Sequence, residues 1–476
     1  MDLAMSMNDR LRRCLYDAGL AVSGLGPAQK LYRTVVTGDV AQLAVQYRLS
    51  ILRHAASHVP YYQGLDLGDR SLRAYPILSK ASLREHSPRL MAQASRGNAS
   101  AVRVGSGGST GEPITAWLDL NALQWDFVGL KYYRHVLLGI DPREHLSSRK
   151  LALWDRNSRI PGRATDLRLR IGRLVSRTTY LNPCVISEEL LGAYVQRINK
   201  LRPKFITAYA SSLYELACFA SRRSLGVHRP QMIFVSGDTL FPTMRSRIEQ
   251  VFGCRIINMY GSREAGLVAG ECLSGRLHIL SFNSTVEVVD DNGEPVAAGR
   301  AGRLLVTSHH NYAMPLIRYN TGDLAAAAAG VCECGNPLPF LGRIVGRVVE
   351  HFPTADGNLV TGGYFFHLFY GHDWVLEFHI LQEELDRVVV FYTRDRRERR
   401  RDEDMEQIAA GIRRVMGDGC KVEWREVDRI PRTPHGKRLF TRSLVWEDRH
   451  AELLQDMTAD RLTFGVDSGS GYSGVV

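Results

Sequence analysis

Residues 256–264 have the sequence Ile-Ile-Asn-Met-Tyr-Gly-Ser-Arg-Glu, an apolar run that ends in a glycine turn and a carboxylate. The apolar runs and amphipathic stretches that precede it are 205–209, 211–224, 232–235 and 242–252. Short strands that alternate with helices predict parallel strands joined by right-handed crossovers. We therefore expect an α/β sheet over residues 203–264.

Polar and glycine residues follow two of these expected strands. Ser236, Gly237 and Asp238 come after one strand, and Tyr260 to Glu264 end the next. Ligands of such sheets bind at loops that follow the carboxyl ends of the strands. The sequence thus places a candidate ligand site at this edge.

The rest of the chain predicts further elements and a division into domains. We expect a helix over 28–57 that Pro60 terminates, because apolar residues recur there at helical spacing. Runs at 286–289 and 304–307 flank a turn at 290–293 and predict antiparallel pairing. Strands at 388–392 and 422–427 around a helix at 404–416 predict a small α+β lobe. The fold class is α/β, with a large domain over 1–347 (β subdomain about 280–345), a mobile lobe over 348–450, and a tail over 451–476 that is flexible from about 466.

Bulk composition restricts the classes of protein to consider. The chain has 476 residues, a net charge of +11, 45% hydrophobic and 23% charged residues, as expected of a globular protein with more than one domain. The amino terminus has charged residues where a signal peptide needs an apolar core, and no run is long enough to span a membrane. We expect a cytoplasmic protein. Its charge fits an anionic ligand, and nucleic acid only loosely.

A second short peptide, Arg318-Tyr319-Asn320-Thr321-Gly322-Asp323, again combines an aromatic ring, a glycine and a carboxylate. Residues 105–113 (Gly-Ser-Gly-Gly-Ser-Thr-Gly-Glu-Pro) form a Gly/Ser/Thr loop that suits an oxyanion, although no lysine follows it as in a Walker A loop. Gly436-Lys437 near the end adds a cation on a flexible turn. Together these segments indicate an ATP-using enzyme.

Each residue has a chemical role and an ordinary structural alternative. Glu264 could ligate Mg²⁺ or be a surface glutamate, and Asp323 could accept the ribose hydroxyls or form a turn. Tyr260 could stack on a base or pack in a core. Lys437 could stabilise phosphate and carboxylate oxygens or be a solvated turn residue.

In this order, the segments resemble the adenylate-forming ligases, and specifically their phenylacetate–CoA ligase-like branch. The closest likeness is Ala313-Met314-Pro315-Leu316-Ile317-Arg318-Tyr319 with Thr321-Gly322-Asp323, followed by Cys332-Glu333-Cys334-Gly335 and Gly346-Arg347. His58-Val59-Pro60-Tyr61-Tyr62 and Pro76-Ile77-Leu78-Ser79-Lys80 resemble relatives found near capsular-polysaccharide genes. The likeness covers about residues 30–445.

The resemblance implies a role for each matching residue. Ser109, Thr110 and Gly111 would contact the triphosphate of ATP, and Glu264 would ligate Mg²⁺. Asp323 and Arg347 would hold the ribose, and Lys437 would act in catalysis with Glu264 and Arg347. The segments that would frame the adenine and its surroundings are Ser236-Gly237-Asp238 and Asn258, Tyr260, Gly261 and Ser262. One departure is Arg263, where the family usually has Thr, which puts a cation beside the phosphates.

Four residues predict a second, separate site. Cys272, His278, Cys332 and Cys334 form a Cys₃His set, which suits tetrahedral structural Zn²⁺. The Cys-x-Cys spacing is tighter than the usual Cys-x₂-Cys. Some phenylacetate–CoA ligase-like proteins resemble this chain in having a metal knuckle at these positions. Reduced buried cysteines beside an unrelated histidine are the alternative.

The function we expect is ATP-dependent activation of a carboxylic acid as an acyl-adenylate, followed by transfer of the acyl group to the thiol of CoA. An amide synthetase that uses an amine acceptor and a non-catalytic nucleotide-binding relative are the alternatives. Phe127, Tyr132 and Tyr209 are candidates for the pocket of a flat acid, although they could equally be core residues. The cofactors would be ATP, Mg²⁺, CoA and structural Zn²⁺. We expect no nucleic-acid partner and no membrane span, and a homodimer is left open.

Overall fold

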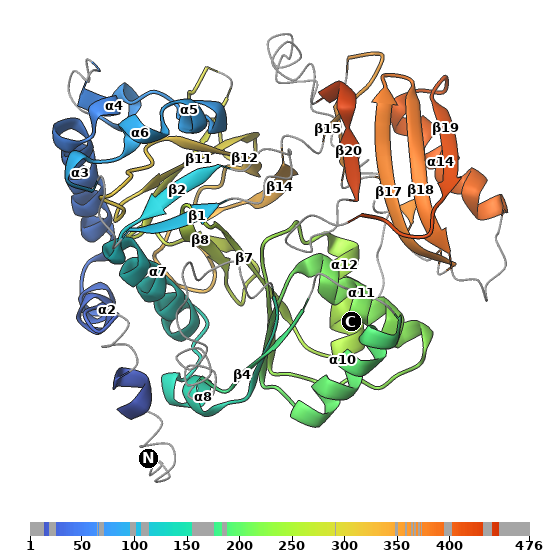
Figure 1. Ribbon diagram of the computed structural model, residues 1–476, viewed down its shortest axis with the longest axis horizontal. Helices are drawn as coiled ribbons and strands as arrows, with labels where there is room; N and C mark the ends of the chain where they lie inside the picture. Colours follow the sequence, from blue (N-terminus) through green and yellow to red (C-terminus); the bar gives the residue numbers. More distant parts are fainter. Residues whose placement is uncertain are drawn as a thin grey trace. The chain divides into compact units, whose positions relative to one another are not determined.

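The computed structural model divides into two compact units, one with the described residues up to Val345 and one with the described residues from Gly346 onward. Figure 1 shows the helices and strands of both. The structure describes residues 14–18, 25–63, 65, 71–95, 101–105, 114–154, 176–182, 188–290, 292–347, 351–357, 359–362, 365, 368–369, 372, 374–394, 402–431 and 440–446.

The first unit contains an eight-stranded sheet in the order β13-β9-β8-β7-β6-β5-β3-β4. Its strands are β3 (Lys150–Leu153), β4 (Thr178–Leu181), β5 (Phe205–Ala208), β6 (Met232–Val235), β7 (Ile256–Ser262), β8 (Gly266–Glu271), β9 (Leu277–Ile279) and β13 (Phe340–Leu341). Strands β3 to β7 pair in parallel, whereas β7, β8, β9 and β13 pair antiparallel. The predicted α/β fold class and the predicted parallel strands are confirmed, and β7 is the strand at which the sheet changes type.

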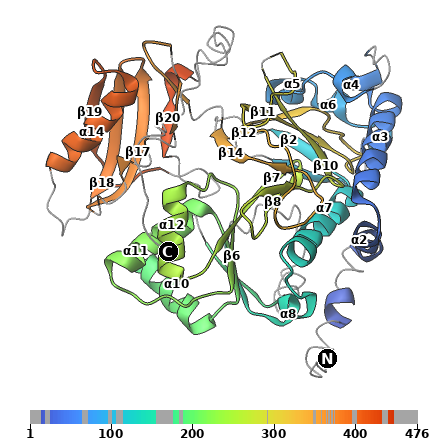
Figure 2. The same cartoon turned by 180° about the vertical axis from the view of Figure 1, so that it is seen from behind.

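Helices cover both faces of this parallel part. Its helices are α7 (Leu120–Tyr132), α10 (Glu188–Leu201), α11 (Ala210–Arg222) and α12 (Pro242–Phe252). Figures 1 and 2 show α10, α11 and α12 on one face of the strands. On the other face, Trp125 of α7 belongs to the same hydrophobic cluster as Phe234 and Ile257. All four residues of β6 are buried, as expected of a parallel strand covered on both sides.

A four-stranded sheet in the order β10-β11-β12-β14, antiparallel from β10 to β12, forms the predicted β subdomain. Its strands are β10 (Ser284–Val289), β11 (Ala301–Ser308), β12 (Tyr319–Ala326) and β14 (Arg343–Arg347). Between β11 and β12 the register shifts, because Arg303 pairs with Leu324 while Leu305 pairs with Asn320. Thr321, Gly322 and Asp323 of β12 thus lie opposite the single residue Leu304 of β11, and such a bulge redirects side chains.

The amino-terminal region differs from its prediction. One helix was expected over 28–57, but α2 (Ala28–Thr37) and α3 (Val40–His58) are separate helices. The Asp39 side chain accepts hydrogen bonds from Ala41 N and Gln42 N at 2.9 and 3.2 Å and so caps α3. Further along, Leu78 bonds the backbone on both sides of Tyr319, which places α5 (Lys80–Glu85) beside the start of β12.

The second unit is the small α+β lobe that the sequence predicts. Its sheet has the order β19-β18-β17-β20, and α14 (Asp402–Met416) joins the parallel strands β18 and β19. The strands are β17 (Val375–Glu384), β18 (Arg387–Arg394), β19 (Lys421–Glu426) and β20 (Thr441–Ser443). Helix α14 has three acidic residues in its first turn and two arginines in its last turn, an arrangement that the helix dipole favours. The tail from 466 lies outside the described residues.

Candidate active site and metal cluster

The two short peptides singled out in the sequence meet in the folded chain. Tyr260 lies on β7, and its hydroxyl donates to Asp323 Oδ2 of β12 at 2.6 Å. The Tyr260 hydroxyl oxygen also lies 3.1 Å from Thr321 Oγ1. The bulge in β12 therefore turns Thr321 and Asp323 toward the carboxyl edge of the parallel strands. Tyr260 supplies a hydrogen bond here in addition to its ring.

Glu264, two residues after the end of β7, is buried with 5% of its surface exposed. Tyr319 of β12 donates its hydroxyl to Glu264 Oε1 at 3.0 Å. The second oxygen, Oε2, is buried and has no hydrogen-bond partner among the described residues. A buried carboxylate oxygen without a donor is costly, so this oxygen fits a role as ligand of a hard cation such as Mg²⁺.

The residues after β6 bind the start of the neighbouring helix. Asp238 accepts hydrogen bonds from Ala210 N at 2.7 Å and Ser211 N at 3.0 Å, and the Ser211 hydroxyl donates to the same carboxylate. Asp238 thus caps α11 with both oxygens. Ser236 N donates to Ala208 O at 3.2 Å, which ties the loop to the end of β5.

Gly237 has φ +90 and lies against the ring of Tyr209. A Cβ at this position would lie 2.8 Å from Tyr209 Cε1 and 3.4 Å from Trp154 Cη2. Tyr209 in turn stacks on Trp154, with ring centroids 4.2 Å apart. The ends of β3, β5 and β6 thereby contribute to one aromatic surface. Because Gly237 has no side chain, its backbone can lie against the Tyr209 ring.

Trp154 was not among the candidates from the sequence. Trp154 follows β3 directly, and its position after a short apolar run could have marked it as a candidate in the sequence. Sequence reasoning also missed Lys80. Its Nζ would lie 3.0 Å from a Cβ on Gly322, so this cation borders the Thr321-Gly322-Asp323 bulge.

The three aromatic candidates for the acid pocket occupy different surroundings. Tyr132 is 4% exposed and meets Phe282 edge-on with centroids 5.0 Å apart, within the cluster that α7 forms. Burial raises the pKa of Tyr132. Phe127 is partly buried against the same cluster. Tyr209 instead belongs to the pair with Trp154.

The remaining candidates on β7 shape its hairpin with β8. Asn258 N donates to Glu271 Oε2 at 2.8 Å, and Ala265 N donates to Ser262 Oγ at 3.1 Å. A Cβ on Gly261 would lie 2.3 Å from Gly266 O, so only glycine allows this contact. Ser109, Thr110, Gly111 and Lys437 lie outside the described residues. Arg347 ends β14, and its side chain is likewise outside the description.

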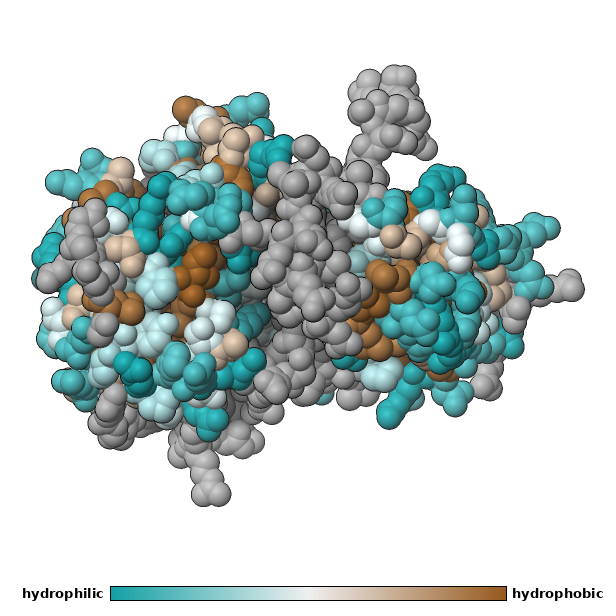
Figure 3. Space-filling model, turned by 90° about the horizontal axis from the view of Figure 1, so that it is seen from above, coloured by the Kyte–Doolittle hydropathy of each residue, from teal (hydrophilic) through white to brown (hydrophobic). Residues whose placement is uncertain are grey.

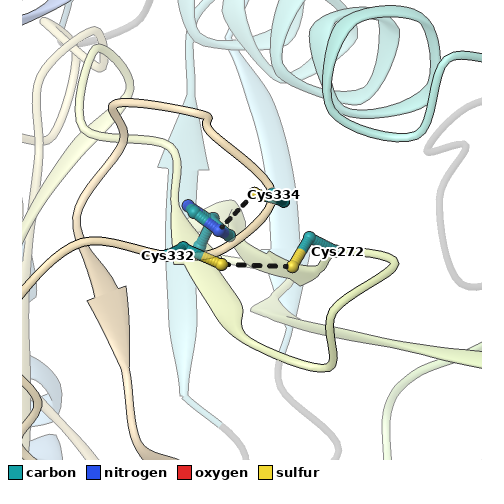
Figure 4. A group of neighbouring side chains, drawn as sticks. Cys272, Cys332 and Cys334 are labelled. Carbon is teal, nitrogen blue, oxygen red and sulfur yellow. Dashed lines mark hydrogen bonds between the residues drawn. The ribbon is translucent and has the colours of Figure 1, made fainter.

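The four predicted zinc ligands form one group. One ligand atom from each of Cys272, His278, Cys332 and Cys334 lies within 4.8 Å of every other. Figure 4 shows the three labelled cysteines converging from two loops. Cys272 Sγ is 3.7 Å from Cys332 Sγ, and Cys334 Sγ is 3.3 Å from His278 Nε2. Two sulfurs on a tetrahedral zinc ion would be about 3.8 Å apart, so the group fits such an ion.

The surroundings of the cluster support the same interpretation. His278 Nδ1 bonds Leu338 O at 2.9 Å, which orients Nε2 toward the sulfurs, as is usual for a metal-bound histidine. The cluster also connects to β7. Glu271, next to Cys272, bonds Arg245 at 2.7 Å and Asn258 N at 2.8 Å.

No helix among the described residues has both the length and the apolar character to cross a membrane. The face shown in Figure 3 is mainly hydrophilic, with small separate hydrophobic areas.

Two family models match the chain. The model described as AMP-binding enzyme matches residues 183–314, and the CapK C-terminal domain matches residues 352–443. The first match contains Tyr209, the Ser236-Gly237-Asp238 loop and Tyr260 to Glu264. The second lies within the small α+β unit.

Similar proteins agree with these matches. Protein CapK of Staphylococcus aureus is 23% identical over 360 residues, which cover 71% of this chain and 73% of that protein. A phenylacetate-coenzyme A ligase of Thermus thermophilus is 30% identical over 175 residues, or 35% of this chain and 38% of that enzyme. A crystal structure of 2-hydroxyisobutyryl-CoA ligase in the postadenylation state has a TM-score of 0.65 at 17% identity, covering 88% of this chain and 91% of that one. This last likeness establishes the fold.

Proposed function

This chain belongs to the adenylate-forming ligase superfamily, in its branch with phenylacetate–CoA ligases and CapK, and from this premise we propose that it activates a carboxylic acid with ATP and transfers the acyl group to CoA. The contacts that bring Asp323 to Tyr260 and Tyr319 to Glu264 are the observation that carries the proposal. They tie the residue that we propose for the ribose and the residue that we propose for the metal to β7 and β12, at the edge of the sheet where ligands of such folds bind.

Asp323 has the position and chemistry for binding the ribose. Its carboxylate accepts the Tyr260 hydroxyl through Oδ2, which fixes the side chain. A carboxylate can accept from two vicinal hydroxyls, as the ribose of ATP requires. Arg347 is proposed as its partner, and Tyr260 as a flat surface beside the base.

Glu264 would hold Mg²⁺ through Oε2, which is buried and accepts no hydrogen bond from the described residues. When bound, the ion neutralises charge on the phosphates of ATP. The Tyr319 hydroxyl keeps the carboxylate oriented by bonding the other oxygen. Ser109, Thr110 and Gly111 are proposed to contact the triphosphate.

The chemistry has two steps. An oxygen of the substrate carboxylate attacks the α-phosphorus of ATP, and the bond to pyrophosphate breaks, which gives an acyl-adenylate. Lys437 is proposed to stabilise the negative charge that develops in this step. The CoA sulfur then attacks the acyl carbon, AMP leaves with the carboxyl oxygen, and the thiol proton passes to solvent. Positioning and electrostatics account for most of the acceleration in both steps.

The Trp154–Tyr209 stack supports a flat acid as substrate, since two rings give a planar wall at the ends of β3 and β5. We also propose that the Cys₃His cluster holds one structural Zn²⁺. A four-ligand site leaves no open position for chemistry.

A library of carboxylic acids tests the proposal by acid-dependent exchange of pyrophosphate into ATP. We expect exchange with at least one acid, and a CoA thioester when CoA is added. Turnover with an amine and without CoA would identify an amide synthetase instead. If no acid supports exchange although Mg·ATP binds, the chain is a nucleotide-binding protein without this activity.

A further inference from the structure

Arg263 stands between two residues with assigned roles, Ser262 at the end of β7 and Glu264. Its guanidinium is partly buried, and Nη1 donates to the backbone oxygen of Gly105 at 3.0 Å. Gly105 is the last residue of β1 (Val102–Gly105), which pairs with β2 (Thr115–Leu118). Figure 1 shows β1 beside β7 and β8. Arg263 therefore lies on the same edge as Tyr260 and Glu264.

Within the part of the chain that the structure describes, this guanidinium has no acidic partner. Among the described residues it makes one hydrogen bond, to a neutral carbonyl group, and no ion pair. Two other partly or fully buried arginines of the same unit are paired: Arg245 with Glu271 at 2.7 Å, and Arg318 with Glu287 at 3.3 Å. Removing a charge from water is costly without compensation, so an unpaired, partly buried cation at a ligand site points to an anionic ligand.

The neighbouring carboxylate does not neutralise Arg263 either. Glu264 is held by Tyr319, and its second oxygen has no partner among the described side chains and backbone groups. The adjacent residues Arg263 and Glu264 thus have opposite charges but bond different groups, Gly105 O and the Tyr319 hydroxyl. A metal-bound triphosphate satisfies both, because the metal binds the carboxylate and the phosphate oxygens bind the guanidinium.

The loop that we propose for the triphosphate supplies no cation of its own. Residues 105–113 contain neither lysine nor arginine. A guanidinium has five N–H donors, so one bond to Gly105 leaves the others for phosphate oxygens.

We propose that Arg263 is a substrate-contacting residue that binds the phosphate oxygens of ATP and of the pyrophosphate that leaves. The role of Arg263 during the reaction rests on the proposed function. As the bond between the α-phosphorus and pyrophosphate breaks, the departing oxygen gains charge. A guanidinium bonded to the pyrophosphate oxygens stabilises that charge.

Two variants and a matched control test the assignment by calorimetry in the full chain. Arg263→Met removes the charge at similar length, and Arg263→Lys keeps the charge but loses the fork of donors. Arg255→Met removes an exposed arginine just before β7 at its far end. The probes are the magnesium complex of α,β-methylene-ATP, inorganic pyrophosphate and AMP.

We expect Arg263→Met to weaken binding of the triphosphate analogue and of pyrophosphate at least about tenfold, because charge-assisted hydrogen bonds are lost. Binding of AMP should stay within about twofold of the native chain, since AMP lacks the leaving phosphates. Arg263→Lys should recover part of the loss, and Arg255→Met should bind all probes as the native chain does. This pattern would support the assignment.

Two outcomes would overturn it: unchanged binding of the triphosphate analogue in Arg263→Met, or an equal loss for AMP, which would mean a general structural role. The proposed function fails separately. If the native chain shows no acid-dependent exchange, yet Arg263→Met weakens the triphosphate analogue selectively, the activity is wrong and the phosphate contact stands.

Discussion

The hydroxyl of Tyr260 donates to Asp323 Oδ2 at 2.6 Å, and this bond joins two strands of different sheets. Tyr260 lies on β7 of the eight-stranded sheet, and Asp323 lies on the bulge of β12 in the four-stranded sheet. The carboxylate that we propose for the ribose is therefore oriented by a residue of the other sheet.

Replacing Tyr260 with Phe should raise the KM for ATP about tenfold, because a hydrogen bond to a carboxylate is lost while the ring remains. The KM for the carboxylic acid should change little. Steady-state kinetics with each substrate varied separately measures both, and the exposed Tyr180→Phe is the control. An equal increase in both constants would contradict a role limited to the nucleotide.

Glu264→Gln should raise the Mg²⁺ concentration needed for half-maximal rate about tenfold or more, because an amide oxygen is a weaker ligand than a carboxylate. The fold should persist, since the Tyr319 hydroxyl can still donate to the amide oxygen. A magnesium titration of the acid-dependent exchange measures this constant. An unchanged titration curve would remove Glu264 as the metal ligand.

Gly237→Ala should destabilise the protein by about 2 kcal/mol or more, because φ +90 strains an alanine and its Cβ would meet the Tyr209 ring at 2.8 Å. Gly139→Ala is the matched control. Gly139 also has a positive φ, of +65, but a Cβ there would have nothing within 4 Å. We expect it to cost only about 1 kcal/mol. Denaturant unfolding of both variants gives the difference, and equal losses would rule out the ring contact as its cause.

The purified protein should contain about one zinc ion per chain, measured by mass spectrometry of the metal. Cys334→Ser should lose most of this zinc and lower the melting temperature, because a structural metal contributes folding energy. Cys254→Ser changes a buried cysteine outside the cluster and should keep the metal. A native protein free of zinc, purified without chelator, would contradict the metal site.

Burial lowers the pKa of His309 to about 3. The neutral ring bonds Thr285 Oγ1 at 2.8 Å and Phe282 O at 3.4 Å. In the unfolded chain a histidine has a pKa of about 6.5. Between about pH 3 and pH 6.5 this residue therefore binds more protons in the unfolded chain than in the folded chain. The contribution of His309 to the free energy of unfolding should therefore be constant above about pH 6.5 and fall as the pH decreases toward 3, by up to about 1.4 kcal/mol per pH unit.

His309→Gln should reduce this slope, measured by denaturant unfolding between pH 4 and 7. The exposed His58→Gln is the control and should change the slope less than His309→Gln does. His310 titrates in the same direction, because burial also lowers its pKa, so part of the slope should remain. An identical slope in native protein and His309→Gln would contradict the assignment.

The parallel strands could be predicted because their signal is local. Each apolar run of β5, β6 and β7 is bounded by a glycine, a proline or an amphipathic helix. The break between α2 and α3 was missed because the apolar periodicity continues across it. Gly38 and Asp39 were the available signal, since glycine ends helices and aspartate caps the next one.

The candidate site was predictable only in part. Motifs identified Glu264 and Asp323 one by one, but their partners Tyr319 and Tyr260 depend on how two sheets are aligned. The bulge at Gly322 sets that alignment and has no pattern of its own in the sequence. Asp238 illustrates the same limit, because its capping of α11 requires the ends of β5 and β6 to be neighbours.

The contacts of Glu271 limit where this protein can be divided when chimeras are made. One side chain receives Arg245 and the Asn258 amide, and the next residue in the chain is a cysteine of the metal cluster. The Tyr133 hydroxyl also donates to the backbone oxygen of Glu271 at 2.9 Å. A chimera that joins two proteins between residues 258 and 272 would separate Glu271 from Asn258. Exchange points for recombination should therefore lie outside that interval.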